Sequence, residues 1–109
     1  MSGFMHITGF PDGPPTKVGY AITDILTGHQ VSQGILAALI QRSITNKGQK
    51  LETSLLESAL YSLSYVAASH LLGDQDYQRM GNSHPLISPY SAYQSADGHW
   101  LVLGIATDK

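Results

Sequence analysis

The chain has no cysteine and few charged residues, and each scarcity excludes a class of structure or function. Without cysteine there is no disulfide scaffold, no thiolate metal site and no cysteine nucleophile. Charged residues make up 13% of the 109 positions, well below the usual level of about a quarter. So few charges leave little material to solvate a complete surface. We therefore expect part of the surface to be covered by a partner or by further sequence.

The chain also lacks a strong positive charge and a long hydrophobic run. Six basic residues and a net charge of −2 leave no electrostatic footprint for nucleic acid. The apolar run from Ile35 to Ile40 is far too short to span a bilayer, and the first residues do not read as a secretory signal. We expect no nucleic-acid or membrane partner and an intracellular location. This would be the cytoplasm in a bacterium, with the mitochondrion and the peroxisome as options in a eukaryote.

The first part of the chain predicts a loop and then one amphipathic helix, all within one small domain. Glycine and proline recur at short intervals through residues 1–18, which is typical of a loop. The helix is expected to begin between Asp24 and His29 and to end near Arg42. Its apolar residues recur at steps of three and four. They predict one buried stripe formed by Val31, Ile35, Leu36, Leu39 and Ile40.

The second part predicts another helix and a β-hairpin. Residues 49–54 alternate in polarity and predict a short strand or an extended link. The second helix is expected over residues 55–72, with Ser54 and Glu57 forming a capping box and Gly73 ending it. Residues 73–89 contain two prolines and predict an irregular segment. The hairpin is expected to pair residues 90–94 with residues 99–105 around a turn at 96–98.

Asp24 is a carboxylate at or just before the predicted start of the first helix. A helix N-terminus favours the ionised form, which a nucleophile needs, by about 0.3–1 kcal/mol. The N–H groups there can also stabilise an oxyanion that develops nearby. An aspartate just ahead of an apolar-periodic run is more commonly a helix cap, and the two roles can coexist. The residues by themselves leave both interpretations open.

The histidines do not predict a metal site. No two of the five have the H-x-x-x-H spacing, and no carboxylates cluster beside them. Two of them are of interest for other reasons. His29 follows Asp24 by five residues and could face the same end of the helix, and His84 lies in the proline-containing segment.

Five stretches of this sequence together resemble a known family. In order they are SGFMHITGFPDGPPTKVG, AITDILTGHQVSQGILAALIQR, TNKGQKLETSLLESAL, RMGNSHPLISPYSAY and QSADGHWLVLG. Their order and spacing resemble the central part of the class III CoA-transferases (CaiB/BaiF type), which include formyl-CoA transferase and carnitine CoA-transferase. The related acyl-CoA racemases share the scaffold.

The resemblance implies an α/β architecture. Residues 1–109 would be the central segment of a longer domain, truncated at both ends. They would carry two helices, a short strand and a C-terminal hairpin of the class III CoA-transferase fold. The upstream portion with most of the CoA contacts would be missing, and the intact protein would be an interlocked homodimer.

The resemblance also implies a chemistry. Asp24 would be the nucleophile that accepts an acyl group from an acyl-CoA thioester and then carries CoA to a carboxylic acid. CoA thioester would be a substrate, with no tightly bound cofactor and no metal. Gly81, Asn82 and His84 would lie near the site, although the glycine run that covers the intermediate in some members is absent here.

Two alternatives to the transferase remain. The first is an acyl-CoA racemase of the same superfamily, in which the aligned aspartate removes a proton from the carbon next to the thioester. The second is a non-catalytic packing module in which Asp24 is only a helix cap. The stretches TDILTG and SHPLISPY resemble the transferases more closely.

Overall fold

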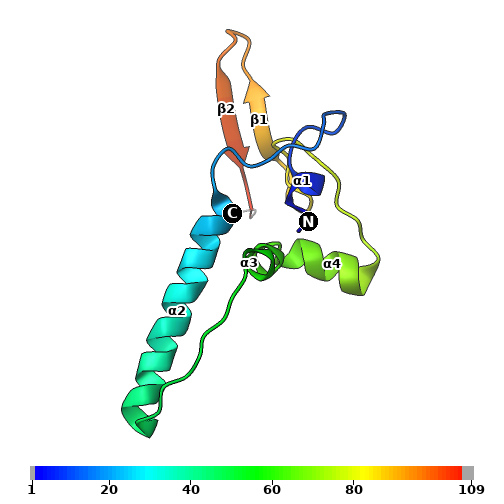
Figure 1. Ribbon diagram of the computed structural model, residues 1–109. Coiled ribbons are helices and arrows are strands. Elements are labelled where there is room, and N and C mark those ends of the chain that lie inside the picture. The colour runs from blue at the N-terminus through cyan, green and yellow to red at the C-terminus, as the bar shows by residue number, and fades with distance from the viewer. Residues whose placement is uncertain (1, 107–109) are drawn as a thin grey trace. The chain divides into compact units, whose positions relative to one another are not determined.

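The computed structural model describes residues 2–106. Within this range the chain forms four helices and two strands (Figure 1). In order they are α1 (Phe4–Ile7), α2 (Ile22–Thr45), α3 (Leu55–Ser62), α4 (Tyr65–Gly73), β1 (Tyr90–Gln94) and β2 (Trp100–Gly104). The described residues fall into two compact units, residues 2–4 with 18–75 and residues 5–17 with 76–106. The mixed α/β class and the C-terminal hairpin are confirmed, whereas the expected two helices and short strand are replaced by four helices and no strand before the hairpin.

In the first unit, α2 is longer at both ends than its apolar pattern predicted. It begins at Ile22, after a tight turn in which the Ile22 N–H donates to the Tyr20 carbonyl at 2.8 Å. It ends at Thr45, because Asn46 adopts a left-handed conformation with φ 54° and donates its N–H to the Arg42 carbonyl. The predicted start at or after Asp24 was therefore wrong.

The predicted buried stripe of α2 is also wrong. Four of its five members are about half exposed or more, with exposed fractions of 48% for Ile35, 61% for Leu36, 52% for Leu39 and 65% for Ile40. The reason is length. The helix that packs on α2 is α3, which has 8 residues against 24, or about 12 Å against about 36 Å. Most of the apolar face of α2 is left uncovered within the described residues.

Residues 49–54 form an extended link and not a strand, because no neighbouring strand pairs with them in the described chain. The Leu51 side chain lies against Gly34 of α2. A Cβ added to Gly34 would be 2.8 Å from both methyl carbons of Leu51. A glycine at this position therefore permits close approach of the link to the helix.

The predicted second helix is divided in two. Its cap is confirmed, since Ser54 Oγ accepts the Glu57 N–H at 3.1 Å and donates to Glu57 Oε2 at 3.0 Å. The helix breaks at Ser64, which has φ 48°, and resumes as α4. The break accompanies burial of Leu63, whose Cδ1 lies close to the backbone of Gly3. Such a long-range contact leaves no local signal in the sequence.

In the second unit, α1 is a short helix inside the segment predicted to be a loop. The strands β1 and β2 pair antiparallel, from Tyr90 opposite Gly104 to Gln94 opposite Trp100. The first strand has the predicted bounds. The second is one residue shorter at each end, because the His99 carbonyl accepts the Ser95 N–H in the turn and the Ile105 N–H donates to the Pro89 carbonyl outside the ladder.

Within the described chain neither face of the hairpin is fully covered. On β2, Trp100 is 69% exposed and Val102 is 77% exposed. The buried core of the described residues is correspondingly small, and it consists of Ser58, Ala59 and Leu63.

Candidate active site

Asp24 lies in the first turn of α2, three residues after the N-cap position, and its side chain is exposed. The N-cap residue is Ala21, which makes no side-chain cap hydrogen bond. The interpretation of Asp24 as a helix cap is therefore wrong. Within residues 2–106 the Asp24 carboxylate has no hydrogen-bond or ion-pair partner.

The backbone around Asp24 offers unused donors. The first helical hydrogen bond of α2 runs from the Ile25 N–H to the Ala21 carbonyl at 3.2 Å. The N–H groups of Thr23 and Asp24 precede it and bond to no carbonyl in the part of the chain described. They belong to the group of unpaired donors at a helix start. Side chains on a helix lean toward its N-terminus, so the carboxylate and these donors lie at the same end of α2.

The helix leaves the Asp24 carboxylate accessible. The residue one turn further along is Gly28, and no atom lies within 4 Å of where its Cβ would be. Residues four apart share a helix face, so no side chain from that position covers Asp24. His29 lies five residues on, about 140° further round the helix, and it faces a different space.

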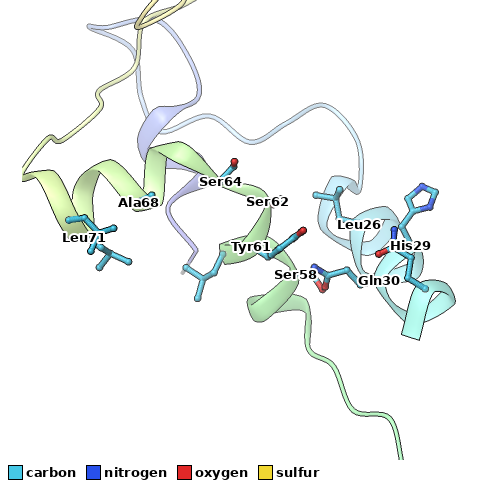
Figure 2. A pocket seen from close by; sticks show the side chains of 12 residues that line it. Leu26, His29, Gln30, Ser58, Tyr61, Ser62, Ser64, Ala68 and Leu71 are labelled. Atoms are coloured by element: carbon cyan, nitrogen blue, oxygen red, sulfur yellow. The ribbon is translucent and has the colours of Figure 1, made fainter. Parts of the chain in front are cut away.

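That space is a cleft of about 820 Å³ in the first unit, between α2 and the pair α3 and α4. Figure 2 shows Leu26, His29 and Gln30 on one side and Tyr61, Ala68 and Leu71 on the other. Apolar and hydroxyl side chains dominate the lining, which contains no carboxylate. Asp24 does not line it, so the cleft is separate from the predicted nucleophile.

One polar contact in the cleft was missed by the sequence analysis. The Ser58 hydroxyl donates to Gln30 Oε1 at 2.6 Å, and the two side chains point toward one another (Figure 2). Ser58 has an exposed fraction of 0%. Its burial satisfies the rule that an interior hydroxyl is hydrogen-bonded. A serine within the apolar run of α3 was the available signal, but its partner is 28 residues away.

The other three predicted site residues, Gly81, Asn82 and His84, lie together in the second unit, in the loop before β1. Gly81 has φ 62° and donates its N–H to the Gly9 carbonyl at 2.8 Å. Asn82 is exposed in the turn. Asp24 belongs to the other unit.

His84 is held by the hairpin. Its Nδ1 accepts the Leu86 N–H at 3.1 Å, and its backbone N–H donates to the Tyr90 carbonyl at 3.2 Å. Its ring centroid lies 5.2 Å from that of Tyr90. Because Nδ1 is an acceptor here, the neutral ring carries its proton on Nε2. These contacts hold the His84 ring against the first residue of β1.

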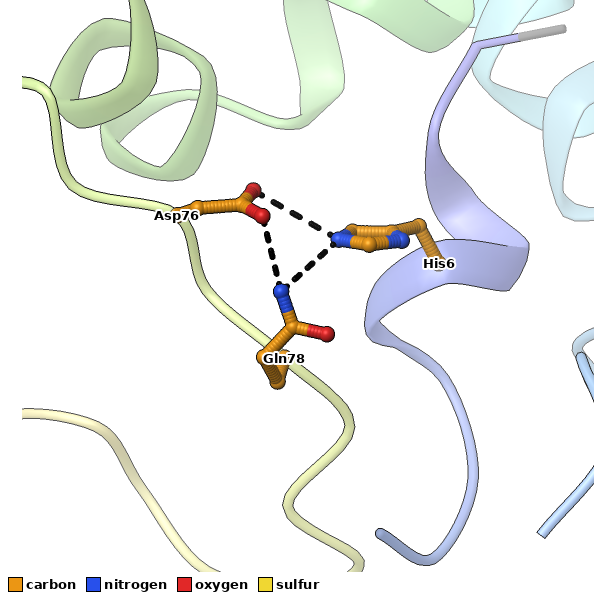
Figure 3. Close-up of polar contacts among 3 residues, drawn as sticks. All are labelled: His6, Asp76 and Gln78. Atoms are coloured by element: carbon orange, nitrogen blue, oxygen red, sulfur yellow. Dashed lines mark hydrogen bonds and ion pairs between the residues drawn. The ribbon is translucent and has the colours of Figure 1, made fainter. Parts of the chain in front are cut away.

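A second histidine forms a polar cluster of three residues (Figure 3). His6 Nε2 lies 3.5 Å from Asp76 Oδ1 and 3.3 Å from Gln78 Nε2, while the Gln78 amide donates to Asp76 Oδ2 at 2.7 Å. His6 and Asp76 are each about half exposed. Such an exposed pair contributes about 0–1 kcal/mol to stability. The cluster joins α1 to the segment that follows α4.

Residues 2–106 contain neither a metal-binding cluster nor a membrane-spanning helix. No three histidine, aspartate or glutamate side chains lie close enough together to hold a metal ion. No helix in this range is long and apolar enough to cross a bilayer.

Comparison with known proteins gives consistent matches along the chain. The sequence profile of CoA-transferase family III matches residues 1–109. Succinyl-CoA:glutarate CoA-transferase of Mus musculus is 42% identical over 109 residues, which are 100% of this chain and 25% of the mouse protein. Succinate--glutarate CoA-transferase of Agrobacterium fabrum is 42% identical over 108 residues, 99% of this chain and 27% of that protein.

A solved structure agrees with these sequence matches. A CaiB/BaiF family protein from Brucella suis superposes with a TM-score of 0.83 at 37% identity, covering 94% of this chain and 27% of the other. The chain thus spans about a quarter of the length of the relatives it matches.

Proposed function

This chain belongs to CoA-transferase family III, and from that premise we propose that it is the central segment of a longer enzyme that transfers CoA from an acyl-CoA to a carboxylic acid. The observation that carries the proposal is the match of the family profile to all of residues 1–109. The relatives are about four times longer than this chain, which supports a central segment with further sequence around it.

In the proposed reaction Asp24 is the nucleophile. One of its carboxylate oxygens attacks the thioester carbonyl, the C–S bond breaks, and CoA leaves as a thiolate from a mixed anhydride. The thiolate then attacks the aspartyl carbonyl and releases the donor acid, which leaves an aspartyl-CoA thioester. The acceptor carboxylate takes the place of the donor acid, and the same two steps in reverse order release the new acyl-CoA and free Asp24.

Three features of α2 support this assignment. The carboxylate is exposed and has no partner among the described residues. It lies in the first turn, where the helix favours negative charge by about 0.3–1 kcal/mol. The N–H groups of Thr23 and Asp24 are available as donors for an oxyanion at the reacting carbonyl. CoA thioester is the substrate, and the proposed steps need no other group.

The substrate class follows from the names of the relatives. The mouse protein is named for succinyl-CoA and glutarate, the Agrobacterium protein for succinate and glutarate, and a Haloarcula hispanica protein, 37% identical over 106 residues, for succinyl-CoA and mesaconate. We therefore propose succinyl-CoA as the donor and a dicarboxylic acid as the acceptor. The extensive uncovered apolar surface of α2 supports a homodimer in the intact protein.

The test is a trapping experiment on the intact protein that carries this segment. Incubated with succinyl-CoA and hydroxylamine, it should form a hydroxamate that peptide mass spectrometry locates at Asp24. Asp24→Asn should lower the transfer rate to glutarate on the order of 10⁴-fold or more, as loss of a nucleophile does. Asp12→Asn changes an exposed loop aspartate in the same way and should leave the rate unchanged.

An adduct elsewhere, or full transfer by Asp24→Asn, would show that Asp24 is not the nucleophile. Exchange of protons next to the thioester carbonyl with deuterated water, without transfer to glutarate, would identify a racemase. If neither reaction occurs and Asp24→Asn alters only the unfolding temperature, the segment is a packing module.

A further inference from the structure

Arg79 is a cation without an anion in the described part of the chain. The ion pairs found there join His6 to Asp76 and Lys50 to Glu52, and neither includes Arg79. Its side chain also makes no hydrogen bond within residues 2–106, and its Nε atom is buried without a partner. Arginine stays charged at any pH at which the protein is folded, so this charge needs a partner or water.

The stem of Arg79 lies against Gly9, in a loop of the same unit. A Cβ on Gly9, which has φ 117°, would lie 3.3 Å from Arg79 Cδ, so the stem rests on bare backbone. The neighbouring Gly81 donates its N–H to the Gly9 carbonyl, and a Cβ on Gly81 would lie 2.8 Å from the Phe10 ring. Each loop thus contributes a glycine and a side chain to the contact between the two loops.

A guanidinium with a buried, unpaired Nε is costly, and its terminal N–H groups are free to pair with an anion. A buried donor without a partner costs about 1–3 kcal/mol, and more when it belongs to a charged group. The terminal Nη atoms are not among the buried unpaired atoms, so they remain reachable. The planar fork of an arginine matches the two oxygens of a carboxylate, which is the anion that protein side chains themselves supply.

We infer that the Nη end of Arg79 binds a carboxylate that the described residues do not supply. This carboxylate has one of two sources. It is either a free dicarboxylic acid or an aspartate or glutamate from another part of the intact protein. The free acid rests on the proposed function, because a dicarboxylic acid is the acceptor proposed there. The carboxylate from the protein itself does not depend on that proposal.

The test compares Arg79→Met with Arg42→Met in the intact protein. Methionine keeps much of the aliphatic stem and removes the charge and the N–H groups. Arg42, the other arginine of the chain, is exposed on α2 and serves as the matched control. Unfolding temperatures are measured without added acid and with glutarate, and glutarate binding is measured by calorimetry.

If the carboxylate is a free acid, glutarate raises the unfolding temperature of the wild type and of Arg42→Met. The dissociation constant of glutarate increases tenfold or more in Arg79→Met. If it comes from the protein, Arg79→Met unfolds about 2 °C or more below Arg42→Met before any acid is added. The inference is wrong if Arg79→Met matches Arg42→Met in both measurements. Neither measurement depends on turnover, so a failed transfer reaction would not affect the outcome.

Discussion

Asp97 is a single side chain that organises the turn of the hairpin. Its Oδ1 accepts a hydrogen bond from the Ser95 hydroxyl and another from the His99 N–H at 3.4 Å. These two hydrogen bonds, the Ser95 contact first, hold the pKa of Asp97 below its ordinary value of 3.8. Gly98 follows with φ 86°, which a glycine adopts without strain. The Asp-Gly pair in the sequence predicted this turn because both effects are local.

The turn should therefore loosen in acid. A carboxyl whose pKa is lower in the folded state than in the unfolded state stabilises the folded state. This contribution is complete at a pH above the unfolded-state pKa, and it is lost as the pH falls through the folded-state pKa. Protection of the His99 amide, measured by NMR as its exchange rate relative to that of an unstructured peptide at the same pH, should be constant down to about pH 4 and weaken below it. Asp97→Asn cannot titrate and should show no such step. A step centred at or above 3.8 in the wild type would contradict the argument.

Elements whose signals are local were predicted well, and elements that depend on distant contacts were not. The cap at Ser54 and the bounds of β1 follow from neighbouring residues, and both are confirmed. The break at Ser64 accompanies the packing of Leu63 against Gly3, sixty positions earlier in the chain. The exposure of α2 depends on which elements cover it, and its own periodicity cannot show that. For the site, sequence located Asp24 at a helix start, but the identity of the cap residue required coordinates.

A glycine at position 64 should relieve the backbone strain at the break between α3 and α4. Ser64 has φ 48° and ψ −121°, a region that side chains with a Cβ rarely adopt. Ser64→Gly should raise the free energy of unfolding by about 1 kcal/mol. Ser62→Gly, two residues earlier at the end of α3, should lower it by about 0.5 kcal/mol, and it also loses the hydroxyl bond to the Ala59 carbonyl. Urea unfolding measures both. Equal losses in the two variants would show that the backbone at Ser64 is unstrained.

At the scale of the whole molecule, the described chain exposes many large apolar side chains and buries few. Large apolar side chains with exposed fractions above 40% occur on α2, on α3 and α4, and on β2. The low content of charged residues already indicated a covered surface. The family relatives, of which this chain spans about a quarter, indicate how much further sequence a protein of this kind holds.

The 109-residue chain by itself should consequently self-associate through α2. Ile40 and Ile44 are 65% and 78% exposed. Changing both to glutamine should shift the chain toward the monomer at a given concentration, because their apolar area drives the contact. Ala37→Gln adds an amide on the same helix without removing a large side chain, and it should have little effect. Sedimentation velocity over a range of concentrations measures the change. A wild-type chain that stays monomeric at every concentration would contradict the prediction.

The contact between Gly34 and Leu51 separates the far end of α2 from the rest of its unit. Beyond it the chain runs out along the helix, turns at Asn46 and returns through residues 47–50, all of them exposed. Extra residues added at 47 or 48 would lengthen an exposed turn of the described chain and leave the pairing of Leu51 with the helix intact. This tip is thus the natural place to carry an epitope tag or a fluorescent label.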